Sequence, residues 1–183
     1  MKKKPGDRVV PFQLPALDGS TFDLNSLKGR PFMLSFFRFA SCPFCNLRMH
    51  RLVQRYGELS PAGGSFTIVA VFDSTPENLR EHATRHQSPF PVLADAGGGV
   101  YRQYDIERSM AGVVKGMVKR MPTLLYAMFG KGYLPTKING DMTTMPADFL
   151  VDPLGNIRLA YYGKDEGDHL PFDEIKRFAN HYQ

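Results

Sequence analysis

The chain has 183 residues, 43% of them hydrophobic and 22% charged, which is ordinary for one soluble globular domain spanning residues 1–183. Its net charge of +5 comes from basic residues spread along the sequence, so a nucleic-acid partner is not expected. No apolar run reaches the roughly 18 residues that span a bilayer, and no signal-peptide core follows the lysines at 2–4. We therefore expect a cytoplasmic protein with no membrane partner.

The first third of the chain predicts a hairpin, a strand and a helix. Residues 11–28 read as short extended pieces around a turn at Asp18–Gly19. The apolar run 32–37 predicts a buried central strand. A helix is expected after it, because apolar residues recur at helical spacing from Phe44 to Tyr56 and Gly57 follows.

The next segment continues the alternation of strands and helices. Residues 66–72 predict a second buried strand, and the Thr75-Pro76-Glu77 sequence predicts a helix start, with the helix reaching about His86. A short strand at 91–94 and a short helix at 100–104 follow.

Residues 107–145 are less regular and are interpreted as an insertion. Apolar residues at helical spacing predict an amphipathic helix in it, on the evidence of Val113, Val114, Met117, Val118 and Met121. The methionines of this segment could line a hydrophobic opening, but packing into the core is the preferred interpretation.

The C-terminal part predicts a hairpin and a closing helix. Strands are expected at 149–151 and 157–161 around a turn at 152–156, and a helix at 172–181. The order of elements predicts an α/β fold in which helices flank a central sheet.

The only two cysteines, Cys42 and Cys45, lie where the first buried strand passes into a helix. Pro43 suits the first helical position, which makes Cys42 the expected N-cap residue. The unpaired N–H groups and positive dipole of a helix N-terminus favour a reactive thiolate there. A second thiol one turn later can attack a sulfenic acid or mixed disulfide on the first. Zinc needs four ligands and the histidines form no ligand-spaced cluster, so no metal and no cofactor is expected.

Three residues near the pair have open roles. Arg38 either stabilises the thiolate by its charge or is a surface arginine at the strand end. Arg48 lies on the same helix as the cysteines and is expected to face solvent. Ser41 either donates a hydrogen bond to sulfur or only fills the turn.

Four segments, residues 6–31, 34–45, 146–157 and 167–175, resemble the alkyl hydroperoxide reductase/thiol-specific antioxidant (AhpC/TSA) family in order and spacing. The resemblance is to its peroxiredoxin-like branch, which carries CxxC, and it covers most of the chain outside 107–145. It implies a thioredoxin-like fold with a central mixed sheet, and thiol-dependent reduction of peroxides or disulfides. Pro146 lies where thioredoxin-fold proteins place a cis-proline beside the active cysteine, although a trans proline starting a strand is the alternative.

The resemblance leaves the attacking sulfur open. The peroxiredoxin pattern P-x-x-x-T-x-x-C, laid on the chain without gaps, places Arg38, Cys42 and Cys45 at its Pro, Thr and Cys positions, whereas the thioredoxin pattern makes Cys42 the nucleophile. We favour Cys42, because an N-cap residue is expected to be more exposed than one a turn further in. The later arginine of typical peroxiredoxins has no counterpart, since Pro146 stands near its place.

Three polar residues of the later motifs receive only structural interpretations. Asp148 is either a buried acid that assists proton transfer or a strand-edge residue facing solvent, and the second is preferred. Asp168 and His169 are expected to fix a turn before Pro171.

The sequence thus predicts a thiol-dependent antioxidant enzyme that reduces hydroperoxides through a sulfenate and then a Cys42–Cys45 disulfide, with Arg38 and Pro146 completing the site. The expected reductant is a thioredoxin- or glutaredoxin-type protein or glutathione, and a homodimer is compatible with the family. The alternatives are a thiol-disulfide oxidoreductase and a non-catalytic redox-sensing or binding module.

Overall fold

The central feature of the fold is a five-stranded mixed sheet with the order β5-β4-β3-β6-β7. A computed structural model describes residues 1–61 and 64–182. Strands β3, β4 and β5 are parallel, and β6 and β7 run antiparallel to their neighbours. The strands are β3 (Phe32–Phe36), β4 (Thr67–Phe72), β5 (Val92–Ala94), β6 (Ala147–Val151) and β7 (Ile157–Tyr162). A small separate hairpin is formed by β1 (Gln13–Pro15) and β2 (Thr21–Asp23).

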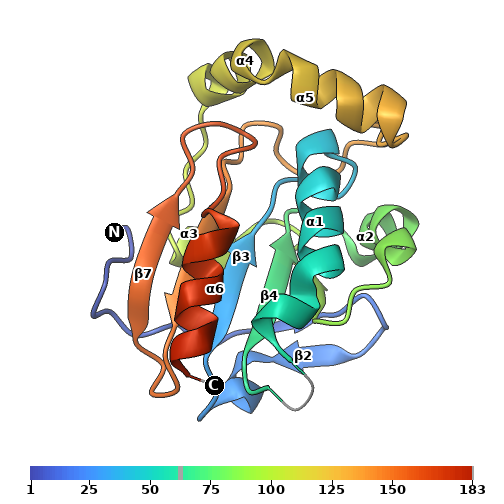
Figure 1. Cartoon of the computed structure of the whole chain (residues 1–183). Coiled ribbons are helices and arrows are strands. Elements are labelled where there is room, and N and C mark those ends of the chain that lie inside the picture. Colours follow the sequence, from blue (N-terminus) through green and yellow to red (C-terminus); the bar gives the residue numbers. More distant parts are fainter. Residues whose placement is uncertain (62–63, 183) are drawn as a thin grey trace.

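Helices cover both faces of this sheet (Figure 1). The covering helices are α1 (Pro43–Leu59), α2 (Pro76–Ala83), α3 (Gly99–Gln103) and α6 (Phe172–His181), and two further helices, α4 (Met110–Lys119) and α5 (Met121–Leu125), lie beyond the end of the sheet (Figure 1). Single turns of 3₁₀-helix lie at Leu24–Leu27 and Thr84–His86, and a π-helix at Tyr126–Gly130. This arrangement confirms the expected thioredoxin-like α/β fold.

The alternation of side chains along β3 divides the interior into two cores. Met33 and Phe37 point to the face that is covered by α1 and α6, together with both cysteines. Leu34 and Phe36 point to the opposite face, where α3 and the N-terminal segment pack. Because all five residues of β3 are buried, the strand reads as a continuous apolar run, as expected for a central strand of this kind.

The insertion predicted at 107–145 leaves the fold and returns to it at one point. The Met145 N–H donates to the Glu107 carbonyl at 2.8 Å, and Ser109 N–H donates to the Thr143 carbonyl at 2.8 Å. Between these ends, α4, α5 and the π-helix lie across the end of the molecule at which α1 begins (Figure 1). The predicted limits of the insertion therefore coincide with its structural neck.

The interpretation of the insertion's methionines as core residues is wrong for Met110, Met117, Met121 and Met142, which are exposed, and holds for Met145 at its end, which is buried. Small residues face the body of the protein, since Gly112, Gly116 and Ala127 are buried. A series of large apolar residues faces away and is exposed. We call it the apolar ridge: Met110, Val114, Met117, Val118, Met121, Leu125, Tyr126 and Phe129. Of the predicted helix face, only Val113 is buried, because a close helix-to-body approach leaves room for little more than glycine.

No helix of the part of the chain described is both long and apolar enough to cross a bilayer.

The returning end of the insertion gives the first testable prediction. Gly140 has φ +120°, and a Cβ there would lie 1.9 Å from the Asp73 backbone carbonyl oxygen. Because a backbone atom cannot move aside cheaply, Gly140→Ala should lower the free energy of unfolding by roughly 3 kcal/mol, the upper end of the range for local strain. Urea denaturation measures this.

The matched control is Gly132→Ala, at φ +69° with no atom within 4 Å of the added Cβ. It carries the strain of a positive φ alone, about 1 kcal/mol. Equal losses in the two variants would contradict the close approach of the insertion to the β4 loop.

Candidate active site

The two cysteines lie at the first turn of α1, as predicted. Cys42 is the N-cap residue with extended backbone angles, and Pro43 occupies the first helical position. Asn46 holds the loop in place, since its side-chain amide donates to the Ala40 carbonyl at 2.7 Å and to the Cys42 carbonyl at 3.0 Å. Its Oδ1 lies 2.8 Å from His86 Nε2. The buried amide therefore ties the cysteine loop to the segment that follows α2.

The prediction that Cys42 is more exposed than Cys45 is wrong. Cys42 is 1% exposed and Cys45 0%, because the helix start is packed inside the core that contains both. Both thiols are free. Exposure therefore does not identify the attacking sulfur, and the two thiols must be distinguished by the charges and hydrogen bonds around them.

Arg38 contacts the two cysteine sulfurs in different ways. It is buried rather than on the surface, and its guanidinium donates from one terminal nitrogen to the Cys42 sulfur at 3.6 Å. Nε donates to the Thr144 carbonyl at 2.9 Å, and the other terminal nitrogen donates to the Met142 carbonyl. Its backbone N–H donates to the Cys45 sulfur at 3.3 Å. One residue at the end of β3 thus contacts both sulfurs and the returning end of the insertion.

The two thiols have opposite pKa shifts. Burial by itself raises the pKa of Cys42, but the hydrogen bond from the Cys45 thiol and the charge of Arg38 outweigh it, and the pKa falls to about 6. Backbone N–H groups of the first helical turn act in the same direction. Burial, and then the hydrogen bond and charge of Cys42, raise the pKa of Cys45 well above its usual value. At neutral pH the thiolate therefore resides on Cys42.

Pro146 is joined to this group only indirectly. The Met145–Pro146 peptide bond is trans, so the cis bond considered from the resemblance is absent and the alternative of a trans proline before a strand holds. Pro146 is buried, and its carbonyl accepts from the Gly163 N–H at 2.8 Å. It lies two residues after Thr144, whose carbonyl Arg38 holds. The structure brings Cys42, Cys45 and Arg38 together, and Pro146 is linked to them only through Thr144, two residues before it in the chain.

Ser41 donates to neither sulfur. Its buried hydroxyl has no hydrogen-bond partner among the described residues.

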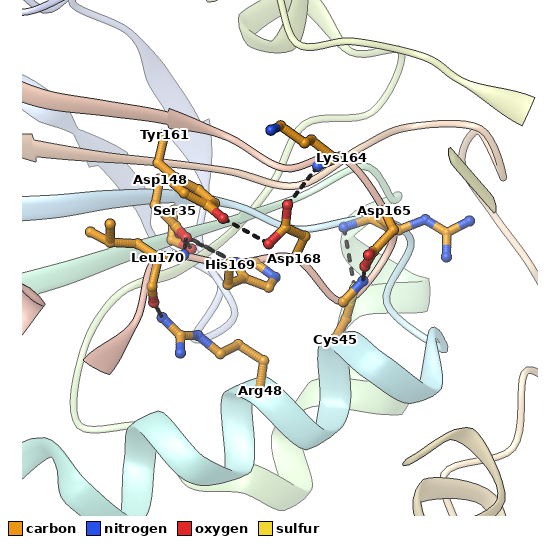
Figure 2. Close-up of polar contacts among 12 residues, drawn as sticks. Ser35, Cys45, Arg48, Asp148, Tyr161, Lys164, Asp165, Asp168, His169 and Leu170 are labelled. Carbon is orange, nitrogen blue, oxygen red and sulfur yellow. Dashed lines mark hydrogen bonds and ion pairs between the residues drawn. The ribbon is translucent and has the colours of Figure 1, made fainter. Parts of the chain in front are cut away.

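A second polar cluster lies on the sheet under α1, and the sequence interpretation of Asp148 was wrong. Asp148 is fully buried in the middle of the sheet, with its carboxylate accepting from Ser35 Oγ at 2.5 Å, from the Leu170 N–H at 2.7 Å and from His169 Nδ1 at 3.1 Å. Figure 2 shows these side chains converging from β3, β6 and the segment after β7. Burial raises the pKa of Asp148, but the charge and hydrogen bond of His169, with Arg48, outweigh it and lower the pKa to about 2.

The same cluster changes the interpretation of Arg48 and His169. Arg48 is half-buried rather than simply facing solvent, since it donates to the Leu170 carbonyl at 2.8 Å and reaches from α1 to the segment after β7 (Figure 2). His169 does more than fix a turn, because its ring packs on Phe37 with centroids 5.1 Å apart. Asp168 accepts from Tyr161 and from the Lys164 N–H, as a turn-fixing residue does. The cluster fastens the C-terminal segment to the helix that carries the cysteines.

Glu166 is a functional candidate that the sequence reasoning missed. It is buried, packs against Gly116 of α4, and one carboxyl oxygen has no hydrogen-bond partner among the described residues. Burial raises the pKa of Glu166, and the charge of Arg38 partly opposes this. The only sequence signal would have been an acid beside Gly167 in the family's C-terminal motif, which says nothing about burial under an insertion.

Comparison with known proteins identifies a family. The AhpC/TSA family model matches residues 5–160. A curated chloroplastic peroxiredoxin Q of Populus jackii is 24% identical over 63% of this chain and 53% of its own length. The thiol-disulfide oxidoreductase ResA of Halalkalibacterium halodurans is 31% identical over 56% of this chain and 57% of its own. The chain therefore spans little more than half the length of these relatives.

Solved structures show the same fold over the whole chain. The peroxidoxin BcpB of Mycobacterium tuberculosis superposes with a TM-score of 0.67 at 18% identity, covering 98% of each chain. At this identity the likeness concerns the fold alone.

The link between Arg38 and the thiolate predicts a titration result. In the reduced protein the thiolate absorbance of Cys42 should appear with a midpoint near pH 6. Arg38→Gln removes the positive charge that favours the thiolate, so the midpoint should rise by about one unit or more. The control is Arg158→Gln, an exposed arginine of β7. An unchanged midpoint in Arg38→Gln would contradict the assigned contact.

The Asp148 cluster predicts a loss of stability. Asp148→Asn removes a buried carboxylate that accepts from Ser35, His169 and the Leu170 N–H, and should lower the free energy of unfolding at pH 7 by about 3 kcal/mol. Because the pKa is depressed in the folded state, the wild-type contribution is present above the unfolded pKa and is lost as the pH falls from about 4 to about 2. Urea denaturation across this range measures both effects. Glu77→Gln, a control whose side chain is 75% exposed, should change stability by less than about 0.5 kcal/mol.

Proposed function

The chain belongs to the AhpC/TSA family, and from this we propose that it is a thiol peroxidase whose attacking group is the Cys42 thiolate. The observation that carries the proposal is the buried contact between Arg38 and Cys42, together with the opposite pKa shifts of the two thiols. A sulfur that is ionised at neutral pH can attack, and a neutral neighbouring thiol can resolve the product.

The proposed reaction runs in three balanced steps. The Cys42 thiolate attacks the terminal oxygen of a hydroperoxide, the O–O bond breaks, and the departing alkoxide or hydroxide takes a proton to leave as alcohol or water. The Cys45 thiol then attacks the sulfenic sulfur, water leaves, and a Cys42–Cys45 disulfide forms. A dithiol protein, or two molecules of glutathione, then returns two electrons and two protons by thiol–disulfide exchange and is itself oxidised to a disulfide.

Arg38 and Glu166 fit the needs of the first step. The guanidinium stabilises the thiolate and can stabilise negative charge on the departing oxygen. Glu166 is a buried acid with a raised pKa within the electrostatic reach of Arg38, which makes it the proposed proton donor to that oxygen. Arg38 would thus take over the charge-stabilising role of the later arginine that the chain lacks. Pro146 is proposed to shape the site only through the neighbouring Thr144 carbonyl.

The burial of the pair favours a small oxidant. With Cys42 1% exposed, a protein disulfide cannot reach the sulfur unless the site opens, whereas hydrogen peroxide is little larger than water. The second candidate, a thiol-disulfide oxidoreductase, is supported by the N-cap position of a low-pKa cysteine and by the 31% identity to a protein of that name. The proposed reductant is a thioredoxin- or glutaredoxin-type protein or glutathione, in the reducing cytoplasm. The homodimer stays a prediction.

Single-turnover oxidation tests the proposal. Reduced protein mixed with hydrogen peroxide should lose both thiols in a rapid second-order reaction and gain the mass of a Cys42–Cys45 disulfide. In Cys45→Ser the reaction should stop at a sulfenate on Cys42, because no resolving thiol remains. Stopped flow and mass analysis follow both stages.

The matched variant is Cys42→Ser, which should fold normally and react with peroxide no faster than a thiol of unperturbed pKa. Slow oxidation of the wild type with fast exchange against a disulfide substrate would establish the second candidate instead. No reaction with either oxidant would leave a binding module.

A further inference from the structure

The apolar ridge of the insertion is the largest feature that the redox chemistry leaves unexplained. Its residues recur every three or four positions from Met110 to Phe129, so they lie along one side of α4, α5 and the π-helix. Val118 is 73% exposed and Phe129 77%. Scattered exposed apolar residues need no explanation, but a continuous series marks an interaction surface.

The helices of the insertion reverse the usual arrangement of a surface helix, in which the large apolar side chains pack against the protein. Glycines and an alanine face the protein, and large apolar side chains face away from it. The inward face is closely fitted: a Cβ on Gly116 would lie 2.1 Å from a Glu166 carboxyl oxygen, and one on Gly112 2.7 Å from the Met145 sulfur. The segment therefore cannot rotate to bury its ridge without losing this fit, and the ridge needs another partner.

The charge of the insertion limits what that partner can be. Residues 108–140 contain six basic residues and no acidic one. Three of the six have carboxylate partners, namely Arg108 with Asp141, Arg120 with Asp165 and Lys137 with Glu81. Lys115, Lys119 and Lys131 have none within ion-pairing distance among the described residues. The ridge is thus accompanied along its length by uncompensated positive charge.

This charge disfavours a second copy of the chain as the occupant. In a two-fold symmetric dimer the same patch meets itself, which would place the three unpaired lysines of one copy opposite those of the other. A surface that is apolar, adaptable and negatively charged fits better. Large apolar and aromatic residues with lysines, along a helix, are the features by which helices lie in the interface of anionic membranes.

The position of the ridge agrees with such a surface. The insertion forms an outer edge of the molecule in Figure 1, and its 21 residues from 110 to 130 have a contour of roughly 30 Å at helical rise. The helices do not need to cross the bilayer, because an interfacial helix buries only its apolar side while its lysines reach the headgroups.

We propose that the apolar ridge, with Lys115, Lys119 and Lys131, docks the protein onto the surface of an anionic lipid membrane. Docking would place the end of α1 that carries the cysteines next to the bilayer, since Leu47 of α1 packs with Ala127 and Tyr133 of the insertion. The proposal replaces the expectation of no membrane partner and does not depend on the peroxidase reaction.

Vesicle co-sedimentation tests it with the full chain. Wild-type protein should bind vesicles of mixed phosphatidylcholine and phosphatidylglycerol at least about tenfold more tightly than phosphatidylcholine alone. Val118→Gln/Phe129→Gln should lower this affinity by about tenfold or more, because two exposed apolar side chains no longer enter the interface. Lys115→Gln/Lys119→Gln should lower it roughly 30-fold, and added salt should weaken wild-type binding.

Two variants elsewhere on the surface serve as matched controls. Leu154→Gln replaces a side chain that is 72% exposed in the turn before β7, and Lys4→Gln/Lys28→Gln removes two exposed lysines outside the insertion. Both should bind as wild type does. All variants should retain the Cys42 midpoint near pH 6, which shows that the site remains folded.

Three results would overturn the proposal. The first is no binding to anionic vesicles. The second is vesicle binding that is unchanged in both Val118→Gln/Phe129→Gln and Lys115→Gln/Lys119→Gln. That result would attribute the binding to the general positive charge of the protein. The third is a wild-type dimer in analytical ultracentrifugation that becomes a monomer in Val118→Gln/Phe129→Gln, together with no binding of the wild-type protein to vesicles. That result would make the ridge a contact between two copies of the chain. Peroxide turnover, measured separately in solution, does not bear on any of them.

Discussion

The contact on which the site depends is the buried guanidinium of Arg38. A buried cation is costly unless its donors and its charge are satisfied. Two backbone carbonyls of the insertion take two of its N–H directions, and the Cys42 sulfur takes another. No carboxylate of the described residues lies within ion-pairing distance of it. The Cys42 sulfur is therefore the anionic group in direct contact with Arg38, so the cation stabilises the reactive form of the thiol and the thiolate stabilises the buried cation.

This contact also explains why the insertion belongs to the site. The carbonyls that Arg38 holds lie at the returning end of the insertion, where Thr144 Oγ1 also donates to Asp73 at 2.9 Å. Glu166 packs from the other side against Gly116 of α4. The environment of Cys42 is thus completed by segments separated from it by about a hundred residues, and a change in the seating of the insertion would reach the thiol through Arg38.

The Asp148 cluster, which lies under α1, has a different role from the cysteine pair, which lies at the first turn of that helix. Its carboxylate binds a serine of β3, a histidine and a backbone N–H of the segment after β7, while Arg48 holds a carbonyl of the same segment. These contacts fix where the C-terminal segment runs, and that segment carries Glu166. The cluster positions the candidate proton donor without touching the sulfurs in any contact described.

The sequence by itself determined the elements and the place of the chemistry. Apolar runs and caps located every strand of the five-stranded sheet and the helices α1, α2, α3, α4 and α6, because hydrophobic period and turn chemistry act locally, but they did not predict α5 or the π-helix. The N-cap position of Cys42 followed in the same way from Pro43. The limits of the insertion, residues 107 and 145, could be predicted because the regular alternation of strands and helices is interrupted between them.

Only the tertiary structure decided which polar groups are buried and which apolar ones are not. Asp148 and a solvent-facing strand residue look alike in sequence, and Arg48 looks like any helix arginine, because burial is set by partners distant in the chain. The spacing of the insertion's apolar residues correctly predicted a helix, but those residues were wrongly expected to face the core. Hydrophobic periodicity shows that a helix has an apolar face and does not show whether that face packs on the protein or points away from it. Cys42 remains the preferred attacking thiol, but not because it is more exposed, since both cysteines are buried. The charges and hydrogen bonds around each sulfur give the two thiols different pKa values. These charges and hydrogen bonds come from residues that are neighbours in space rather than in sequence.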